Sequence, residues 1–291
     1  MSKYRIATLL PSATELVAEI GLAESIVCIS HECDTPTYIT HLPKVTSSSI
    51  PNYSNQTLID QFVKESVKNG TSLYDINLNL LKELDVTHIV TQGICDVCAV
   101  SPKLIEANLR GNQCILSSDI KIISLCGTTI NGIFDDVMAL SKTFKREQVG
   151  KEIVTIAKHK LKKLAKTNTQ KHTVLMLEWL DPPYIAGHWV PEQIQAAGFH
   201  CAAGGIGDKS TEISWNEIVS MDPDYIGVIS CGGNSELNQK YADTLYKKEM
   251  LKNTKAVRNN MIFGFDANKF FSRPTLRVID GVDKLKNKFV K

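Results

Sequence analysis

The 291-residue sequence has no apolar run long enough to cross a membrane. A transmembrane helix needs about 18 or more consecutive apolar residues, and the apolar stretches of this chain are much shorter. The first residues also lack the pattern of a secretory signal, because their short apolar stretch stops at Pro11 without a small-residue cleavage site. The sequence therefore predicts no membrane span and a cytoplasmic location.

An excess of charge of one sign is lacking as well. The 33 Lys and Arg residues nearly balance the 31 Asp and Glu residues, which leaves a formal net charge of +2. Such a balance implies no polyelectrolyte partner. The one basic run, residues 158–166, contains no aromatic residue and is typical of a solvated helix face. We therefore expect no nucleic-acid partner, and the sequence does not distinguish a monomer from a dimer.

Several catalytic and cofactor motifs are absent. The glycines of Gly204-Gly-Ile-Gly207 lack the spacing of a dinucleotide-binding loop, and no G-x-S-x-G nucleophile turn occurs. No acid–base or nucleophile pair is discernible from residue spacing. These absences favour a binding protein over an enzyme.

Strand patterns alternate with helical patterns through most of the chain, which predicts an α/β fold with parallel sheets. Between the two alternating regions, apolar residues recur at helical spacing without proline. They predict one long helix, with Gly150 as its weak point, and about 35 residues of helix would span roughly 50 Å. We therefore expect two Rossmann-like α/β lobes joined by one connecting helix, with a ligand cleft between the lobes. The predicted parts are residues 1–130, 131–167 and 168–291.

The two alternating regions also echo each other in sequence. In each, an acidic residue begins a β-rich apolar stretch that ends at a cysteine: Asp85 to Cys95, and Asp222 to Cys231. In addition, the segment from Pro11 to Gly21 resembles residues 191–198. The echo indicates two related α/β units, and ligands of open α/β sheets bind outside the carboxyl ends of the strands.

The predicted carboxyl ends of the strands bring together the aromatic and polar groups of a small-molecule pocket. Several members also have ordinary structural interpretations. His31 and Glu32 can cap backbone groups, Trp189 can belong to the core, and Arg273 can pair with a surface carboxylate rather than with a ligand anion. The candidate ligand-binding residues are Pro11, Ser12, His31, Glu32, Glu178, Trp179, Tyr184, His188, Trp189, Phe271 and Arg273.

The eight cysteines fall into two groups. Cys28, Cys114, Cys126 and Cys201 lie in or beside apolar runs, where small buried thiols are common. Three interpretations stay open for Cys95-x-x-Cys98: half of a thiolate metal site, a redox dithiol, or two unrelated loop thiols. The candidate ligands of a Zn or Fe ion are Cys33, Cys95, Cys98, Cys231, His31 and His188.

The whole chain resembles the substrate-binding proteins of vitamin B12 and ferric-siderophore uptake, which have two lobes joined by a helical backbone. Within that class it is similar to a branch without signal peptides that is called cobalamin-binding. The matching segments are Leu10-Pro-Ser-Ala-Thr-Glu15, Ser30-His-Glu-Cys-Asp34, Thr91-Gln-Gly-Ile-Cys-Asp-Val-Cys98, Leu177-Glu-Trp-Leu-Asp-Pro-Pro183, Ala186-Gly-His-Trp-Val-Pro191 and Arg273-Pro-Thr-Leu-Arg-Val-Ile-Asp-Gly281.

The resemblance implies a binding protein for a corrinoid, such as cobalamin, or for a related metal chelate held between the lobes, with an ABC transporter as a partner. Trp179, Trp189, Tyr184 and Phe271 would supply flat contacts, and a cleft imidazole or thiol would approach the metal. Two alternatives use the same cleft: a thiolate and histidine site for a metal ion, and a metal-dependent enzyme.

Overall fold

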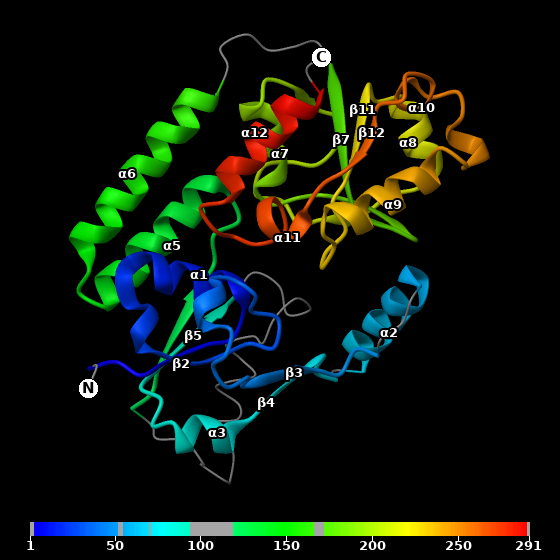
Figure 1. Ribbon diagram of the computed structural model, residues 1–291. Helices are drawn as coiled ribbons and strands as arrows, with labels where there is room; N and C mark the ends of the chain where they lie inside the picture. The colour runs from blue at the N-terminus through cyan, green and yellow to red at the C-terminus, as the bar shows by residue number, and fades with distance from the viewer. Residues whose placement is uncertain (1–2, 52–54, 70, 94–118, 166–171, 290–291) are drawn as a thin grey trace. The chain divides into compact units, whose positions relative to one another are not determined.

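The computed structural model describes residues 3–51, 55–69, 71–93, 119–165 and 172–289 (Figure 1). The chain divides into two compact units, and each unit takes discontinuous parts of the sequence. Unit 1 consists of residues 1–127 and 134–153, and unit 2 of residues 128–133 and 154–291. Both units combine parallel strands with helices, which confirms the predicted α/β class. None of the helices described is long and apolar enough to span a membrane.

Unit 1 is built on a four-stranded parallel sheet with the strand order β2-β1-β5-β6. One face of the sheet packs a core that includes Ala7, Cys28 and Ile89, all fully buried. The helix α1 contacts β1, β2 and β5. The strands are β1 (Ile6–Thr8), β2 (Ile26–Ile29), β5 (His88–Gln92) and β6 (Lys121–Leu125).

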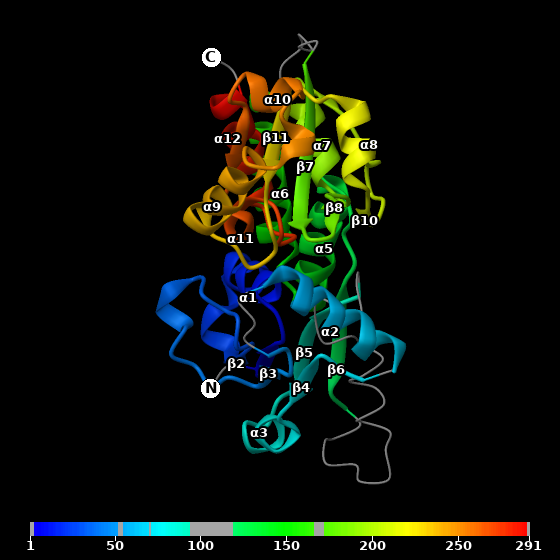
Figure 2. The ribbon, with the colours of Figure 1, turned by 90° about the vertical axis from the view of Figure 1, so that its right-hand side faces the viewer.

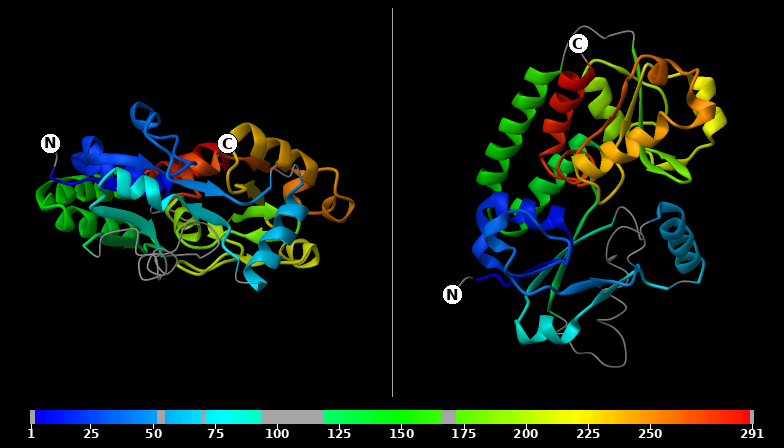
Figure 3. Two further views of the ribbon diagram at one scale, coloured as in Figure 1. Left: turned by 90° about the horizontal axis from the view of Figure 1, so that it is seen from below. Right: turned by 45° about the vertical axis from the view of Figure 1, so that its right-hand side comes forward.

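The stretch of residues 35–55 is rich in Ser, Thr and Pro, yet it contains a strand. β3 (Thr46–Ser48) pairs antiparallel with β4 (Tyr74–Ile76). α2 (Gln56–Lys68) lies in the chain between these two strands and stands off from the sheet of unit 1 (Figure 3). Among the residues described before β6, two further helices are α1 (Pro11–Val17), which continues through a wide turn over Ala18–Leu22, and α3 (Leu78–Glu83).

The region predicted as one long helix is helical but contains two helices. They are α5 (Ile130–Thr143) and α6 (Glu147–Leu164). The break falls at Lys145, which has a φ of 57°, and not at Gly150. The amides of Lys145 and Arg146 donate to the carbonyls of Lys142 and Ser141, at 3.2 and 2.7 Å. These are the bonds of a Schellman end, which usually places a glycine where Lys145 stands. The expectation of a single helix is therefore corrected.

Unit 2 has a six-stranded sheet in which parallel and antiparallel pairs are mixed. β7 pairs in parallel with β11 and β9, and β11 pairs in parallel with β12. β8 turns back to pair antiparallel with β7, and β10 pairs antiparallel with β8. The strands are β7 (Thr173–Leu180), β8 (Pro183–Ile185), β9 (His200–Cys201), β10 (Thr211–Glu212), β11 (Tyr225–Val228) and β12 (Ile262–Gly264).

The helices of unit 2 cover both faces of its sheet (Figures 1 and 2). On one face, Leu175, Ile226 and Ile262 pack with side chains from α8, α9 and α10. On the other face, Tyr225 and Phe263 contact Phe289 of α12. The helices are α7 (Val190–Ala196), α8 (Trp215–Met221), α9 (Ser235–Leu245), α10 (Lys255–Arg258), α11 (Ala267–Phe270) and α12 (Val278–Phe289).

Candidate functional site

The carboxyl edge of the unit 1 sheet carries the first group of predicted residues. β1 leads through Leu10 to Pro11, which begins α1 and is buried. Ser12 is 1% exposed, and its hydroxyl has no hydrogen-bond partner among the described residues. A buried hydroxyl without a partner costs free energy, so it needs a structural or functional reason. Ser12 stays a candidate, whereas the ring of Pro11 has little surface to offer a ligand.

His31 and Glu32 follow β2 at the same edge. The His31 Nδ1 atom lies 2.8 Å from the Thr46 hydroxyl of β3, and the backbone amide of His31 donates to the same oxygen at 3.1 Å. Thr46 thus fixes the orientation of the His31 ring through Nδ1, and Nε2 takes no part in the contact with Thr46. The side chain of Glu32 is exposed, and its amide donates to Ser30.

Cys33 does not have the surroundings of a metal ligand. It is 5% exposed, and its sulfur lies 3.0 Å from the Thr14 hydroxyl, which is itself 2.6 Å from that of Thr8. The thiol is therefore part of a buried polar chain under α1. Cys126, which the sequence places in the core, is exposed at the end of β6.

Sequence reasoning missed the residue that holds the loop after β6. Asp136 of α5 accepts hydrogen bonds from the backbone amides of Cys126 and Gly127, at 3.0 and 2.8 Å. Asp136 is 9% exposed, and burial raises the pKa of its carboxyl more than the two amide bonds lower it. A carboxylate in the first turns of a helix after a strand is the only sequence signal for this role.

In unit 2, an aromatic row crosses the sheet beyond the end of β11. Trp179 of β7 lies opposite Tyr184 of β8, and Tyr184 lies opposite Glu212 of β10. Directly opposed residues share one face of a sheet. The Tyr184 hydroxyl donates to Glu212 at 3.3 Å, while the indole nitrogen of Trp179 is buried without a partner among the described residues. Both rings are only partly buried, so they present flat apolar surface.

Glu178 lies at an irregularity in the pairing of β7 with β8, between Leu177 and Trp179. Bulges of this kind re-aim side chains and are frequent beside binding sites. The Glu178 carbonyl accepts the amide of Cys231 at 3.4 Å, which joins the end of β7 to the loop after β11.

His188 is held in an unusual backbone conformation with a φ of 54°. Its amide donates to Asp208 at 2.6 Å, and its carbonyl accepts from Gly207 at 2.8 Å. Gly187 must be glycine because a Cβ there would lie 2.4 Å from the Asp208 carbonyl. The sequence predicts His188 at a strand's carboxyl end, but β8 runs back along β7, and the Ala186 amide donates to Met176. Ala186, two residues before His188, therefore lies beside the middle of β7.

The surroundings of His188 favour the neutral form of its imidazole. Its ring stacks on Trp189, with centroids 5.7 Å apart. Burial, with a further contribution from Lys209, lowers the pKa of His188 from 6.5. Nδ1 is buried without a partner among the described residues, whereas Nε2 is not among the buried unpaired atoms. Since no hydrogen bond occupies Nε2 in that part of the chain, Nε2 is the nitrogen that a ligand can reach.

Two predicted ligand contacts are instead part of the core of unit 2. Trp189 is 4% and Phe271 1% exposed, and the Trp189 indole donates to the Phe271 carbonyl at 2.8 Å. A flat contact with a ligand is therefore not supported for either ring, because each is enclosed by protein. Arg273 is partly buried in the turn that precedes α12.

Cys231 is exposed in the loop after β11. A second residue that sequence reasoning missed fixes the backbone of this loop. Asn238 of α9, which is fully buried, accepts from Ser230 at 2.9 Å and donates to Gly233 and Phe265, at 3.2 and 2.8 Å. Within the described ranges, no group of three or more His, Cys, Asp and Glu side chains could hold a metal ion. Cys95, Cys98 and Cys114 lie outside those ranges, so the CxxC interpretations stay predictions.

Comparison with known proteins gives a family and a fold. A family model described as periplasmic binding protein matches residues 113–268, more than half of the chain. Among curated proteins, no significant match is found. A possible iron-binding (periplasmic solute-binding) protein from Staphylococcus epidermidis is 18% identical, with full coverage of both chains and a TM-score of 0.73.

Two structures from Vibrio cholerae share the fold at similar identity. The periplasmic heme-binding protein HutB is 18% identical, with full coverage of both chains and a TM-score of 0.72. The periplasmic vitamin B12 binding protein BtuF is 19% identical over 98% of this chain and 95% of its own, with a TM-score of 0.67. Likeness at these identities is a likeness of fold.

Proposed function

The chain belongs to the periplasmic binding protein family and is a solute-binding protein; from that premise, we propose that its solute is a corrinoid or a related metal chelate. The shared fold supports this class of ligand, because similar structures are described as binding vitamin B12 and heme. A fold alone does not specify a ligand, so the proposal must rest on residues of this chain.

The observation that carries the proposal is the neutral imidazole of His188. A metal ion takes the unprotonated nitrogen of histidine, and burial keeps His188 in that form. The left-handed backbone and the stack on Trp189 fix the direction of the ring, so little conformational entropy is lost when a metal binds. Nε2 would be the atom of His188 that binds the metal of the chelate.

The row formed by Trp179 and Tyr184 supports a flat ligand. Each ring is partly exposed, and the two lie on the same face of the β7–β8 pair. Contact with aromatic side chains of this kind would stabilise a bound tetrapyrrole-like ring.

The proposal extends to an ABC transporter as the partner that receives the solute. The cytoplasmic location stays a prediction.

A titration followed by absorbance tests the proposal. Purified full-length protein is mixed with aquocobalamin, heme and a ferric siderophore in turn, and the spectrum and the binding isotherm are recorded. We expect saturable binding of at least one chelate with a shifted spectrum. His188→Ala is expected to weaken binding about tenfold or more and to abolish the shift. His200→Ala, which removes an exposed imidazole of the same unit, is the matched control.

The pH dependence sharpens this test. Because a proton and a metal compete for His188, affinity is expected to be constant down to about pH 6.5 and to fall at lower pH, below the lowered pKa. The proposal is wrong if none of the three chelates binds. A shift that survives in His188→Ala would keep the ligand class but remove the role of His188.

A further inference from the structure

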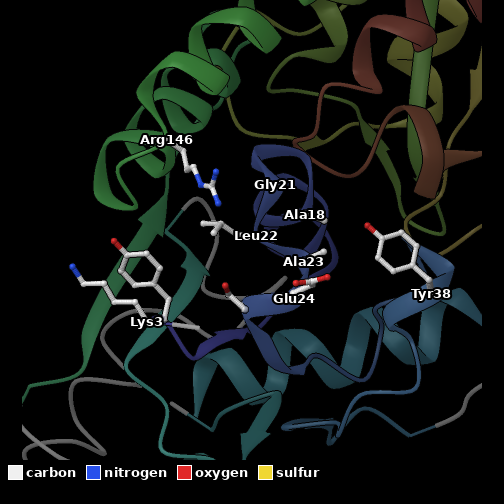
Figure 4. A pocket seen from close by; sticks show the side chains of 10 residues that line it. Lys3, Ala18, Gly21, Leu22, Ala23, Glu24, Tyr38 and Arg146 are labelled. Atoms are coloured by element: carbon white, nitrogen blue, oxygen red, sulfur yellow. The ribbon is translucent and has the colours of Figure 1, made fainter. Parts of the chain in front are cut away.

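Unit 1 contains a cavity that is separate from every residue discussed so far as a candidate. Its volume is about 530 Å³, within the range of small-molecule sites. Figure 4 shows Arg146 reaching toward Leu22, with Glu24 and Tyr38 further along the same lining. The side chains that matter for its chemistry are Lys3, Tyr4, Leu22, Glu24, Tyr38 and Arg146.

The cavity lies at the amino ends of the strands. Lys3 and Tyr4 precede β1, and Ser25 immediately precedes β2. Pro11 and His31 follow the same two strands, so they lie at the opposite edge of the sheet. A ligand in this cavity would therefore not contact the candidate residues that the sequence predicts at the carboxyl ends of the strands.

The positive side of the cavity is held in place by the protein backbone. Arg146 follows the left-handed residue Lys145, its amide donates to Ser141 at 2.7 Å, and its carbonyl accepts from Gly150 at 3.0 Å. The end of α5 and the start of α6 thus fix the point from which the guanidinium projects. Among the described residues, the Arg146 side chain has neither a hydrogen bond nor an ion pair.

The charges that line the cavity do not neutralise one another. Lys3 lies over the Tyr4 ring at 5.9 Å, and Glu24 forms no ion pair with Lys3 or Arg146. Two cations and one carboxylate leave a net positive lining. An arginine without a carboxylate partner offers a planar, bidentate donor for an oxyanion.

The rest of the lining suits an apolar, flat body. Tyr4 is fixed by edge contacts with His88 and Phe144, at centroid distances of 5.3 and 5.1 Å. Leu22 is 5% exposed and closes one wall. The chain passes the cavity at Gly21 with a φ of 81°, and a Cβ placed there would meet no atom within 4 Å. The space beside this turn is therefore open.

We propose that this cavity binds a small organic anion, in which an oxyanion group contacts Arg146 and Lys3 and a flat ring lies against Tyr4 and Leu22. The proposal does not depend on the chelate at His188. Lys3 and Arg146 attract the anion, and Glu24, which lines the same cavity, repels it. The affinity for an anion therefore depends on the balance of these three charges.

Isothermal titration of the full-length protein with phenyl phosphate, benzoate and phenol tests the proposal. Phenol carries the ring without the oxyanion and is expected to bind more weakly than either anion, and the two anions separate phosphate from carboxylate preference. Arg146→Gln is expected to weaken binding of the better anion about tenfold or more, since it removes charge-assisted hydrogen bonds. Glu24→Gln is expected to tighten it about twofold, because the change removes charge repulsion through solvent but no hydrogen bond to the anion.

Lys142→Gln is the matched control, since it removes an exposed cation of α5 that does not line the cavity. The thermal unfolding midpoint of each variant shows that it is folded. Two results overturn the proposal: no saturable binding of either anion in the millimolar range, or equal weakening by Arg146→Gln and Lys142→Gln. The second result would mean that only general surface charge attracts the anion.

Discussion

Asp136 and Asn238 show how single side chains shape the strand ends of this protein. Each comes from a helix and binds backbone groups of the loop that follows a strand: Cys126 and Gly127 for Asp136, Ser230 and Gly233 for Asn238. The acceptors differ in charge, however. A buried carboxylate carries a desolvation cost that an amide does not, so only Asp136 couples its loop to pH.

We expect Asp136 to make the stability of the protein depend on pH. Its pKa in the folded state is raised above 3.8, so the folded protein binds the proton more tightly than the unfolded chain. The contribution of Asp136 to stability is therefore largest below about pH 4 and is lost as the pH rises through the raised pKa. Urea unfolding of wild type and Asp136→Asn between about pH 4 and 7 measures this. The wild type should lose stability relative to the variant as the pH rises.

Asp135→Asn is the control for this experiment, because Asp135 is the exposed neighbour in α5. Burial is the largest cause of the raised pKa of Asp136, and the charge of Asp135 is a smaller one. Most of the pH dependence should therefore remain in Asp135→Asn. Parallel stability curves for wild type and Asp136→Asn would contradict the prediction.

At the residue scale, local sequence predicted the burial of some cysteines and not of others. The cysteines of β2 and of the loop after it show why. Cys28 is fully buried as expected, and burial raises its pKa to about 12. Cys33 follows β2 in a loop-like stretch and yet is buried, with its sulfur 3.0 Å from the hydroxyl of Thr14 in α1. Which loop a helix covers is a tertiary property that local sequence does not encode.

At the element scale, the described parts of the two echoing segments share local backbone features. Asp85 and Asp222, the predicted acidic starts of the two strands, have φ values of 44° and 45°. Aspartate tolerates this left-handed conformation better than most residues. The helices α1 and α7 both have proline in their first turn, and the glycines after them, Gly21 and Gly198, have φ values of 81° and 92°. Such end signals are local, which is why the sequence could predict them.

The strands that the sequence missed have no such local signal. β3, β4, β8 and β10 are two or three residues long and pair with one another or with the edge of a larger strand. A stretch as short as Thr46–Ser48 shows too little alternation to be distinguished from a loop. Its pairing with Tyr74–Ile76 depends on the fold of the chain between them.

The break between α5 and α6 gives a prediction at this scale. Lys145 is exposed and holds a left-handed conformation, which costs a residue with a Cβ about 1–2 kcal/mol. Glycine avoids that cost but loses more entropy on folding, so Lys145→Gly is expected to stabilise the protein by about 0.5–1 kcal/mol. Lys142→Gly, three residues earlier in α5, is expected to destabilise it by about 1 kcal/mol. Denaturant unfolding compares the two, and a loss of stability in both would contradict the prediction.

At the scale of the whole molecule, neither compact unit is a continuous piece of the chain. Residues 134–153 belong to unit 1, although the sequence predicts them as part of a connection between two domains. The reason lies in the buried side chains of α5. Val137, Leu140 and Phe144, which are among the apolar residues that suggested a connection between domains, are each no more than 2% exposed, and so is the neighbouring Phe134. Their helical spacing was read correctly, but spacing does not tell which unit a helix completes.

A fragment that ends at residue 127 is therefore expected not to fold, whereas one that ends at residue 153 is expected to fold. The shorter fragment loses the buried side chains of Phe134, Val137, Leu140 and Phe144. Burial of each contributes about 1.5–3 kcal/mol, or roughly 6–12 kcal/mol together. That sum is comparable to the whole stability of a typical domain, about 5–15 kcal/mol. Circular dichroism and urea unfolding of fragments 1–127 and 1–153 measure the difference. A cooperative unfolding transition in fragment 1–127 would instead place the domain boundary before α5, as the alternation of strands and helices alone suggests.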